Sequence, residues 1–359
     1  MKKLNLFKVF TSKSCSDAVN KVLESGFIGQ GPKVDLFESL IQSHFNTNKR
    51  IITLNSCTAA LDLAYELIGV NEGDTVISTP MTCVATNTPL YNRKANIIWA
   101  DVDPITGLID PNDIAKKINS NVKAIVCVDW CGNPCDYDAL RKFGIPIVED
   151  AAHAINTQYN GTHIANSGGD YVCWSFQAIK HLTCGDGGAL VVPKDKVENA
   201  VKMRWYGFDR TLSSSFRCAQ DITTYGNKYH MNDIAATIGI ENLKYTNSLV
   251  QKSIFNSKKY SDNINNKKVN VIPFDNRSSY WIYTTLVDDK ESFIKYMTEN
   301  NIEVSPVHNR NDNYTIFKKF KTELPNLDTF FSKQIAIPNG WWLTEKEIDY
   351  IIKTINNWK

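Results

Sequence analysis

Short runs of apolar residues alternate with helical segments along the first half of the chain. The strand-like runs lie at residues 75–78, 97–101, 124–128 and 144–148, with helix-forming sequence between them. The run at 124–128 is almost wholly apolar, as expected of a strand buried on both faces. This alternation predicts an α/β fold, with a mostly parallel central sheet that helices cover on both sides. In such sheets, ligands bind beyond the carboxyl ends of the strands.

The alternation of strands and helices ends before residue 248, with a long apolar helix predicted at 234–243. A connecting helix is predicted at 249–260, and a polar, lysine-rich stretch follows at 263–270. The remainder combines strand-like residues 281–286 with further helices, which suits a smaller α+β unit. Because 359 residues exceed the size of one small domain, we expect two: a large α/β domain at 1–248 and a small α+β domain at 249–359.

Composition narrows the class of protein. With 43% hydrophobic residues, the chain can bury a large core, and its net charge of +2 shows no nucleic-acid footprint. Nine scattered cysteines do not form a disulfide framework, and the Cys131–Cys135 spacing lacks the partners of a zinc site. No apolar run reaches membrane-spanning length, and residues 1–10 lack a signal-peptide core. These features predict a reduced, cytoplasmic protein without a metal or membrane partner.

Lys180 lies at the centre of a glycine-rich connection between two strand-like runs. The connection covers residues 174–188, and its glycines at 185, 187 and 188 permit a sharp turn and a close approach of backbone to a ligand. Partial desolvation there would lower the pKa of the lysine and expose a nucleophilic amine, as Schiff-base chemistry requires. The alternative is a surface lysine in a glycine turn.

Two carboxylates, Glu149 and Asp150, follow the apolar strand that ends at Val148. Asp150 and His153 are three residues apart and would share a helix face. A carboxylate that emerges at the carboxyl end of a buried strand needs a cationic or hydrogen-bonding partner, which favours a functional role. The alternative is an ordinary helix start, where an acidic residue suits the helix dipole.

Small polar residues also precede a predicted helix at 59–67. Ser56, Cys57 and Thr58 would cap this helix and leave backbone amides pointing outward, which is a suitable site for a phosphate. A plain helix cap is the alternative. Farther along, residues 211–225 are polar and irregular and predict a loop.

Together these segments resemble the DegT/DnrJ/EryC1/StrS family of sugar aminotransferases, which use pyridoxal 5′-phosphate (PLP). The matching motifs span nearly the whole chain in the family's order, and they lie at 31–32, 56–61, 149–153, 175–188 and 226–233. The resemblance implies the aspartate-aminotransferase-like fold, that of the type I PLP enzymes, and a homodimer with a shared active site. Within the family, the sequence most resembles members that act at C4 of nucleotide-linked 4-keto-6-deoxy sugars.

The resemblance also implies roles for individual residues. Lys180 matches the lysine that is joined to PLP as a Schiff base, and Asp150 matches the carboxylate that pairs with the pyridine nitrogen. His153 matches the residue beside the cofactor ring. Phosphate contacts are implied for Cys57, Thr58 and Ser175 and, from the partner subunit, for Lys228, where many members carry Asn. Cys83 stands where relatives place an aromatic ring against the cofactor.

The substrate contacts carried over are Asp209, Arg210, Tyr229 and His308. The surroundings of His308 depart from the family pattern, so a loop histidine without a ligand is its alternative. For Asp209 and Arg210 the alternative is a surface ion pair.

The implied reaction moves an amino group from L-glutamate to the keto sugar and gives a nucleotide-linked 4-amino-4,6-dideoxy sugar for glycan or O-antigen biosynthesis. Amination at C3 is an alternative position. Another alternative is a PLP-dependent sugar 3-dehydratase, in which His replaces the lysine; His181 stands beside Lys180 and makes this comparison relevant. A nucleotide-binding oxidoreductase would need a Gly-x-Gly-x-x-Gly motif after an early strand, and the sequence has none.

Overall fold

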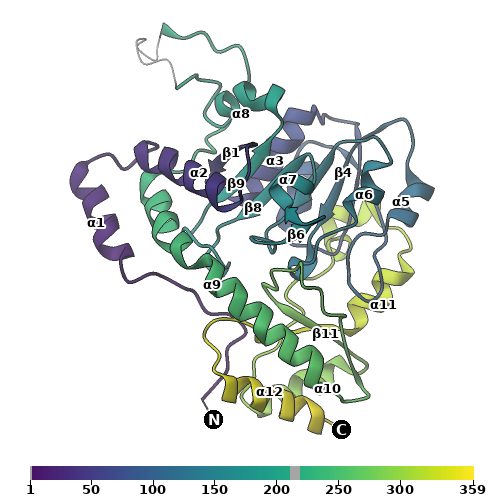
Figure 1. Ribbon diagram of the computed structural model, residues 1–359. Coiled ribbons are helices and arrows are strands. Elements are labelled where there is room, and N and C mark those ends of the chain that lie inside the picture. The colour runs from purple at the N-terminus through teal and green to yellow at the C-terminus, as the bar shows by residue number, and fades with distance from the viewer. Residues whose placement is uncertain (1, 211–218) are drawn as a thin grey trace.

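A seven-stranded sheet forms the centre of the larger part of the molecule (Figure 1). The computed structural model describes residues 2–210 and 219–359, and the strand count refers to these residues. In spatial order the strands are β1 (Arg50–Leu54), β9 (Gly188–Val192), β8 (Tyr171–Ser175), β5 (Ile147–Asp150), β4 (Val122–Val128), β2 (Thr75–Ser78) and β3 (Asn96–Trp99).

The sheet is mixed but mostly parallel, as the alternating pattern predicted. Strands β8, β5, β4, β2 and β3 run parallel to their neighbours in this group. Strand β9 is antiparallel to both β1 and β8. Because β8 and β9 are adjacent and antiparallel, the connection that carries Lys180 turns back beyond the carboxyl end of β8, next to the carboxyl end of the parallel strand β5.

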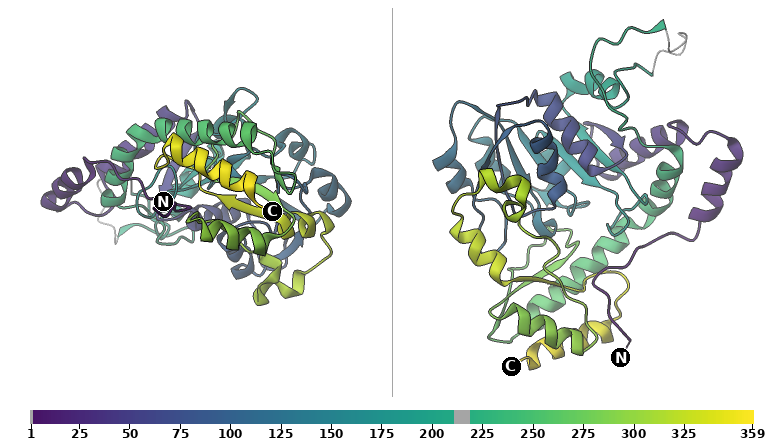
Figure 2. Two further views of the ribbon diagram at one scale, coloured as in Figure 1. Left: turned by 90° about the horizontal axis from the view of Figure 1, so that it is seen from below. Right: turned by 180° about the vertical axis from the view of Figure 1, so that it is seen from behind.

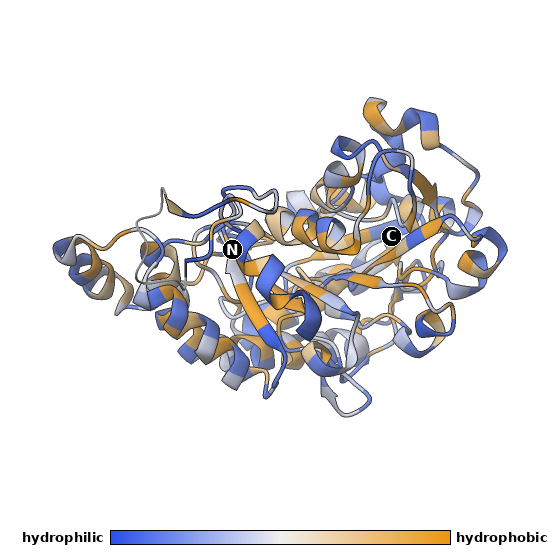
Figure 3. Cartoon of the chain, turned by 90° about the horizontal axis from the view of Figure 1, so that it is seen from above, coloured by the Kyte–Doolittle hydropathy of each residue, from blue (hydrophilic) through white to orange (hydrophobic). Residues whose placement is uncertain are grey.

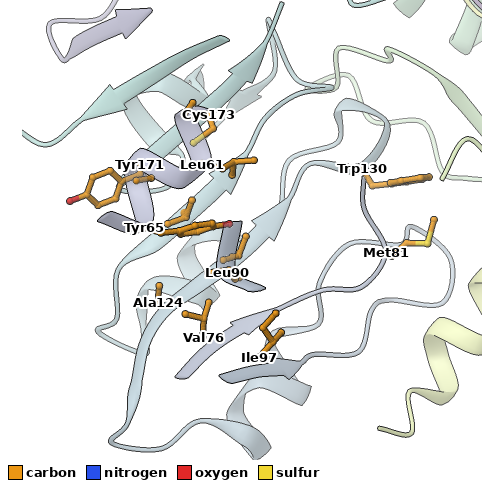
Figure 4. Packing of buried hydrophobic residues seen from close by; sticks show 14 of the residues in the cluster. Leu61, Tyr65, Val76, Met81, Leu90, Ile97, Ala124, Trp130, Tyr171 and Cys173 are labelled. Carbon is orange, nitrogen blue, oxygen red and sulfur yellow. The ribbon is translucent and has the colours of Figure 1, made fainter. Parts of the chain in front are cut away.

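Helices cover both faces of this sheet. On one face, Leu61 and Tyr65 lie in the same buried cluster as Val76 and Ala124 (Figure 4). On the other face, the helix that contains Phe37 packs against alternate strand residues. The helices of the larger part are α1 (Cys15–Ser25), α2 (Pro32–His44), α3 (Cys57–Ile68), α4 (Val84–Asn92), α5 (Pro111–Lys117), α6 (Tyr137–Arg141), α7 (Ile164–Ser167) and α8 (Val197–Met203).

The C-terminal part is a smaller α+β unit. Its antiparallel sheet has the order β10 (Val269–Val271), β11 (Tyr283–Val287) and β12 (Gln334–Ile337). The helices are α10 (Lys290–Glu299), α11 (Pro325–Lys333) and α12 (Glu345–Asn357), and a third buried cluster fills this unit. In the hydropathy view, the strands are largely apolar while the outer helices alternate between apolar and polar residues (Figure 3). Among the described residues, no helix has both the length and the apolar character of a membrane span.

The structure differs from the sequence prediction at the expected domain boundary. One helix of 31 residues, α9 (Asp233–Asn263), replaces the two predicted helices and runs through residue 248. In addition, Leu4 pairs with Ile302 and belongs to the buried cluster of the small unit, and Figure 2 shows both termini near this unit. We retain the division at 248/249 as a proposal, with the first residues of the chain packed on the second unit. Of the predicted loop at 211–225, residues 211–218 lie outside the described residues.

Two buried acids, Asp129 and Glu149, lie on the face of the sheet that is turned away from α3. Glu149 follows Val148 and precedes Asp150, so strand alternation points it away from α3. Its Oε2 accepts a hydrogen bond from the amide of Gly169 at 2.6 Å, while Oε1 of Glu149 and Oδ2 of Asp129 have no recorded partner among the described residues. Burial raises the pKa of Asp129 to about 6 and raises the pKa of Glu149 well above its usual range. We infer that the two carboxyl groups share one proton near neutral pH.

This pair predicts a pH-dependent stability. Folding raises the pKa of Glu149, so stability is lost as pH rises from about 4.5 towards the folded-state value. In Glu149→Gln the amide can keep the bond from Gly169 and donate to Asp129. We therefore expect the free energy of unfolding at pH 8 to increase by about 1–3 kcal/mol, with a smaller gain at pH 5. Denaturant unfolding at both pH values measures this difference.

The matched control is Glu323→Gln, which makes the same change at an exposed position. It should shift the stability by less than about 0.5 kcal/mol at either pH. If Glu149→Gln is less stable than the unchanged protein at both pH values, the shared proton is contradicted.

Candidate active site

The connection that carries Lys180 is folded back on itself by its own backbone. The amide of Phe176 donates to the carbonyl of Gly187, and the amide of Cys184 donates to the carbonyl of Phe176, both at 2.9 Å. Gly185 has φ +83°, which a residue with a side chain rarely adopts. At Gly188 a Cβ would lie 2.5 Å from the backbone of Ser56. Gly185 therefore provides the predicted sharp turn, and Gly188 allows the connection to approach the backbone of Ser56. The approach of this backbone to a ligand stays a prediction.

Lys180 is half-buried at this turn rather than exposed on the surface. Burial lowers the pKa of its amine to about 8, while the charge of Asp150 acts in the opposite direction. Among the described residues, no hydrogen bond or ion pair is recorded for Nζ, which instead lies 3.3 Å from the ring centroid of Trp281. Near neutral pH a part of this amine is unprotonated and nucleophilic.

Asp150 ends strand β5 with its side chain towards α3. Its Oδ2 accepts a hydrogen bond from the hydroxyl of Thr86 at 2.6 Å, and Oδ1 accepts one from the amide of Ala152 at 3.1 Å. Burial raises the pKa of this carboxyl, whereas the bonds from Thr86 and Ala152 and the charge of Lys180 lower it. A cation brought to Asp150 in this cavity would be strongly attracted, because little water screens the charge.

His153 lies on the aromatic side of the same site. Its ring stacks on Trp281 with the centroids 4.2 Å apart, and it is parallel to His308 at 5.9 Å. Burial, together with the positive charge of Lys180, lowers the pKa of His153 well below its usual value, so the ring is neutral. Its Nδ1 has no recorded partner among the described residues.

The start of α3 supplies the anion-binding end of the site. Ser56 caps the helix by accepting a hydrogen bond from the amide of Ala59 at 3.1 Å. Cys57 and Thr58 occupy the first two helical positions, where an amide has no acceptor within the helix. These two amides and the positive end of the helix dipole can bind a phosphate group.

A cavity of about 430 Å³ brings most of the predicted residues together. It is lined by Cys57, Thr58, Cys83, Asp150, His153, Ser175, Lys180 and His308. Tyr229 lines a neighbouring cavity with Ser56 and Thr58, and its hydroxyl donates to Asp62 at 2.7 Å. Lys228 is exposed in this chain. Asp209 and Arg210 lie outside the lining of either cavity, with Arg210 bonded to Gln30.

Sequence reasoning missed two residues of the site. Thr86 lies in α4 and contacts Asp150, and its hydroxyl is 2.7 Å from that of Thr82. The sequence signal was the pair of threonines four residues apart at the start of a predicted helix. Trp281 comes from the C-terminal unit, and no local pattern linked it to Lys180.

His181, the neighbour of Lys180, forms a hydrogen bond with Ser253 of α9 at 3.0 Å and is not part of the cavity lining. Of these two neighbours, Lys180 lines the cavity and His181 does not.

Comparison with known proteins identifies the family. Residues 11–356 match the model of the DegT/DnrJ/EryC1/StrS aminotransferase family. The structure of AtS13 from Actinomadura melliaura has a TM-score of 0.95 at 34% identity and covers 99% of both chains. The sugar aminotransferase CalS13 from Micromonospora echinospora has a TM-score of 0.93 at 31% identity, over 98% of this chain and 99% of the other. The spore coat polysaccharide biosynthesis protein SpsC from Bacillus subtilis is 27% identical over 94% of this chain and 92% of its own.

The cofactor of this family fits the residues present. PLP carries an aldehyde, a basic pyridine nitrogen and a phosphate, and the cavity offers a half-buried amine, a buried carboxylate and a helix N-terminus that fit these three groups. Within the described part of the chain, no group of His, Cys, Asp and Glu side chains is arranged to hold a metal ion. The family match, the fold of a type I PLP enzyme and this set of donors agree. The chain belongs to the DegT/DnrJ/EryC1/StrS family and is a PLP-dependent sugar aminotransferase.

Proposed function

We propose that this chain moves an amino group from L-glutamate to a nucleotide-linked 4-keto-6-deoxyhexose. The product would be a nucleotide-linked 4-amino-4,6-dideoxy sugar for glycan or O-antigen biosynthesis. The observation that carries the proposal is that one cavity holds the amine of Lys180, the carboxylate of Asp150 and the first amides of α3. The role of SpsC in polysaccharide biosynthesis supports the same class of product.

The walls of the cavity support a deoxy sugar as acceptor. Phe7, Trp281 and Val307 contribute apolar surface beside the polar groups. A methyl group at C6 can be buried against such a wall without leaving a polar group unpaired, whereas a hydroxyl would need a partner. The polar edge of the sugar would then face His153 and His308, which share the cavity.

Two parts of the site would hold the cofactor. The amides of Cys57 and Thr58, with Ser175 at the end of β8, would bind the phosphate. Asp150 would pair with the pyridine nitrogen and keep it protonated. When bound, PLP supplies an aldehyde that accepts an amino group and a ring that withdraws electrons from the reacting carbon. His153 would lie beside that ring, and Cys83 would cover it with a polarisable thiol instead of an aromatic side chain.

Lys180 would carry out the proton transfers. Its side chain lines the cavity, and a pKa of about 8 lets the amine accept a proton near neutral pH and return it later. In each half of the reaction, Lys180 would move one proton between the carbon of the substrate and the carbon of the cofactor.

We further propose a homodimer with a shared active site. Lys228 is exposed beside the cavity that contains Ser56, and its carbonyl accepts a bond from Asn55 at 3.1 Å, so its side chain is available to a partner's phosphate site. Large apolar side chains are exposed on the segment that precedes Lys228 and on the segment that follows α1, namely Ile222, Tyr225, Phe27 and Ile28.

The proposed substrate contacts are Asp209, Arg210, Tyr229 and His308. A cytoplasmic location is consistent with the free thiols of all eight described cysteines.

Removal of the Thr86 hydroxyl should weaken cofactor binding. In Thr86→Val, Asp150 loses a charge-assisted hydrogen bond that lowers its pKa. Asp150 is then more often protonated and pairs less well with the pyridine nitrogen. We expect the Kd for PLP, measured by absorbance titration, to rise about tenfold at pH 7 and by more at pH 6.

Thr86→Ser is the matched control, because it keeps the donor and should bind PLP within about twofold of the unchanged protein. Equal affinity of the Val and Ser variants for PLP at both pH values would contradict the role of this hydrogen bond.

The donor and acceptor can be tested by spectroscopy of the holoenzyme. L-Glutamate should diminish the visible band of bound PLP and release one 2-oxoglutarate per site. A nucleotide-linked 4-keto-6-deoxyhexose should then restore the band. Lys180→Ala should lower the rate of both half-reactions by about 10³-fold or more, because it removes the proton-transferring amine. His181→Asn, which changes the neighbouring residue outside the cavity, should leave both rates within about threefold.

Three results would contradict parts of this proposal. A band that ignores L-glutamate rules out this donor. Recovery of the band only with a 3-keto sugar moves the reaction to C3. Loss of both half-reactions in His181→Asn, with Lys180→Ala unaffected, would exclude Lys180 as the proton-transferring residue.

A further inference from the structure

Trp281 connects the C-terminal unit to the connection that carries Lys180. It lies two residues before β11, and its indole Nε1 donates a hydrogen bond to the carbonyl of Ile179 at 2.9 Å. The ring is buried and stacks with Phe7 from the N-terminal segment, with the centroids 5.1 Å apart and the planes at 21°. The indole is therefore fixed by a backbone bond on the residue before Lys180 and by aromatic packing.

The face of this indole is the recorded partner of the Lys180 amine. Nζ lies 3.3 Å from the ring centroid, well inside the range in which an ammonium group is attracted to an aromatic face. The two carboxylate oxygens of Asp150 already accept hydrogen bonds from Thr86 and from the amide of Ala152. The structure thus gives the amine an uncharged partner, and it leaves Asp150 to the pyridine nitrogen.

We propose that Trp281 is a positioning residue that holds the amine of Lys180 whenever this amine is not joined to the cofactor. The inference rests on the proposed function, in which Lys180 is free after the donor has left its amino group in the site. A lysine has four rotatable side-chain bonds, and a free ammonium group could point in many directions. The indole face keeps Nζ in the cavity, next to the atoms between which it must move a proton.

Other titratable groups in the cavity define the background for a test. The lining contains the carboxylates of Asp150 and Asp186, the imidazoles of His153 and His308, and the thiols of Cys57 and Cys83. None of these groups is substituted in a Trp281 variant, although His153 loses its stacking partner. His153 is neutral in the pH range in which Lys180 titrates, so a change in the protonation of Lys180 in such a variant reports the loss of the indole.

The experiment uses the full-length protein saturated with pyridoxamine phosphate, in which Lys180 is free without any need for L-glutamate. Competitive labelling with fluorodinitrobenzene over a range of pH, followed by mass mapping of the Lys180 peptide, gives the pKa of this lysine. Loss of the cation–π contact disfavours the ammonium form, so Trp281→Leu should lower that pKa by about one pH unit. Trp281→Phe keeps an aromatic face without the N–H group and should lower it by less.

Trp342→Leu is the matched control. Its indole also donates to a backbone carbonyl, that of Asn5 at 3.1 Å, but Trp342 does not line the cavity. This variant should leave the pKa of Lys180 unchanged. If Trp281→Leu does not fold, the graded effect of Trp281→Phe still tests the proposal. An unchanged or raised pKa of Lys180 in the folded Trp281 variants overturns it.

The outcome is separable from that of the proposed function. A lowered pKa of Lys180 in Trp281→Leu supports the positioning role even if the enzyme rejects L-glutamate or the 4-keto sugar. In contrast, normal amino transfer combined with an unchanged pKa would preserve the function and overturn the positioning role. With active holoenzyme, the positioning role also predicts that Trp281→Leu lowers kcat about tenfold, in addition to any change in KM that follows from the loss of apolar surface beside the sugar.

Discussion

The shielding of two opposite charges from water in one cavity is the constraint on which the rest of the site depends. Asp150 is buried and Lys180 is half-buried, and this desolvation shifts the pKa of the amine downward and that of the carboxyl upward. Neither charge is tolerable there without partners. Thr86 and the amide of Ala152 supply them for Asp150, and the indole of Trp281 supplies one for Lys180. The same arrangement leaves both groups in the cavity in which we propose that PLP binds.

The two units of the fold each contribute to this balance. The sheet places Asp150 at the carboxyl end of β5, with its side chain towards the first turn of α3. The antiparallel connection from β8 to β9 brings Lys180 to the same end of these strands. The C-terminal unit and the first residues of the chain then close the cavity with Trp281, His308 and Phe7. A variant that loosens the contact between the units would therefore alter the protonation of Lys180 as well as access to the cavity.

The sequence was sufficient for features that depend on local pattern. Lys180 and Asp150 could be proposed because each comes at or after the end of a short apolar strand, and the glycines around Lys180 permit a tight connection. Thr86 and Trp281 could not be assigned roles, since their contacts join segments far apart in the chain. The break between two helices that was predicted after residue 243 was wrong, because the polar residues there lie within α9. Thr246 is buried in this helix, and its hydroxyl donates a hydrogen bond to the carbonyl of Asn242.

The central claim is that Lys180 is the residue joined to the cofactor in this cavity. Borohydride reduction of the holoprotein, followed by peptide mass mapping, tests it most directly because reduction fixes a lysine–PLP linkage permanently. The account predicts one phosphopyridoxyl group per chain, on Lys180. A label on another lysine, such as Lys228, or no label on protein that has bound PLP, would contradict it.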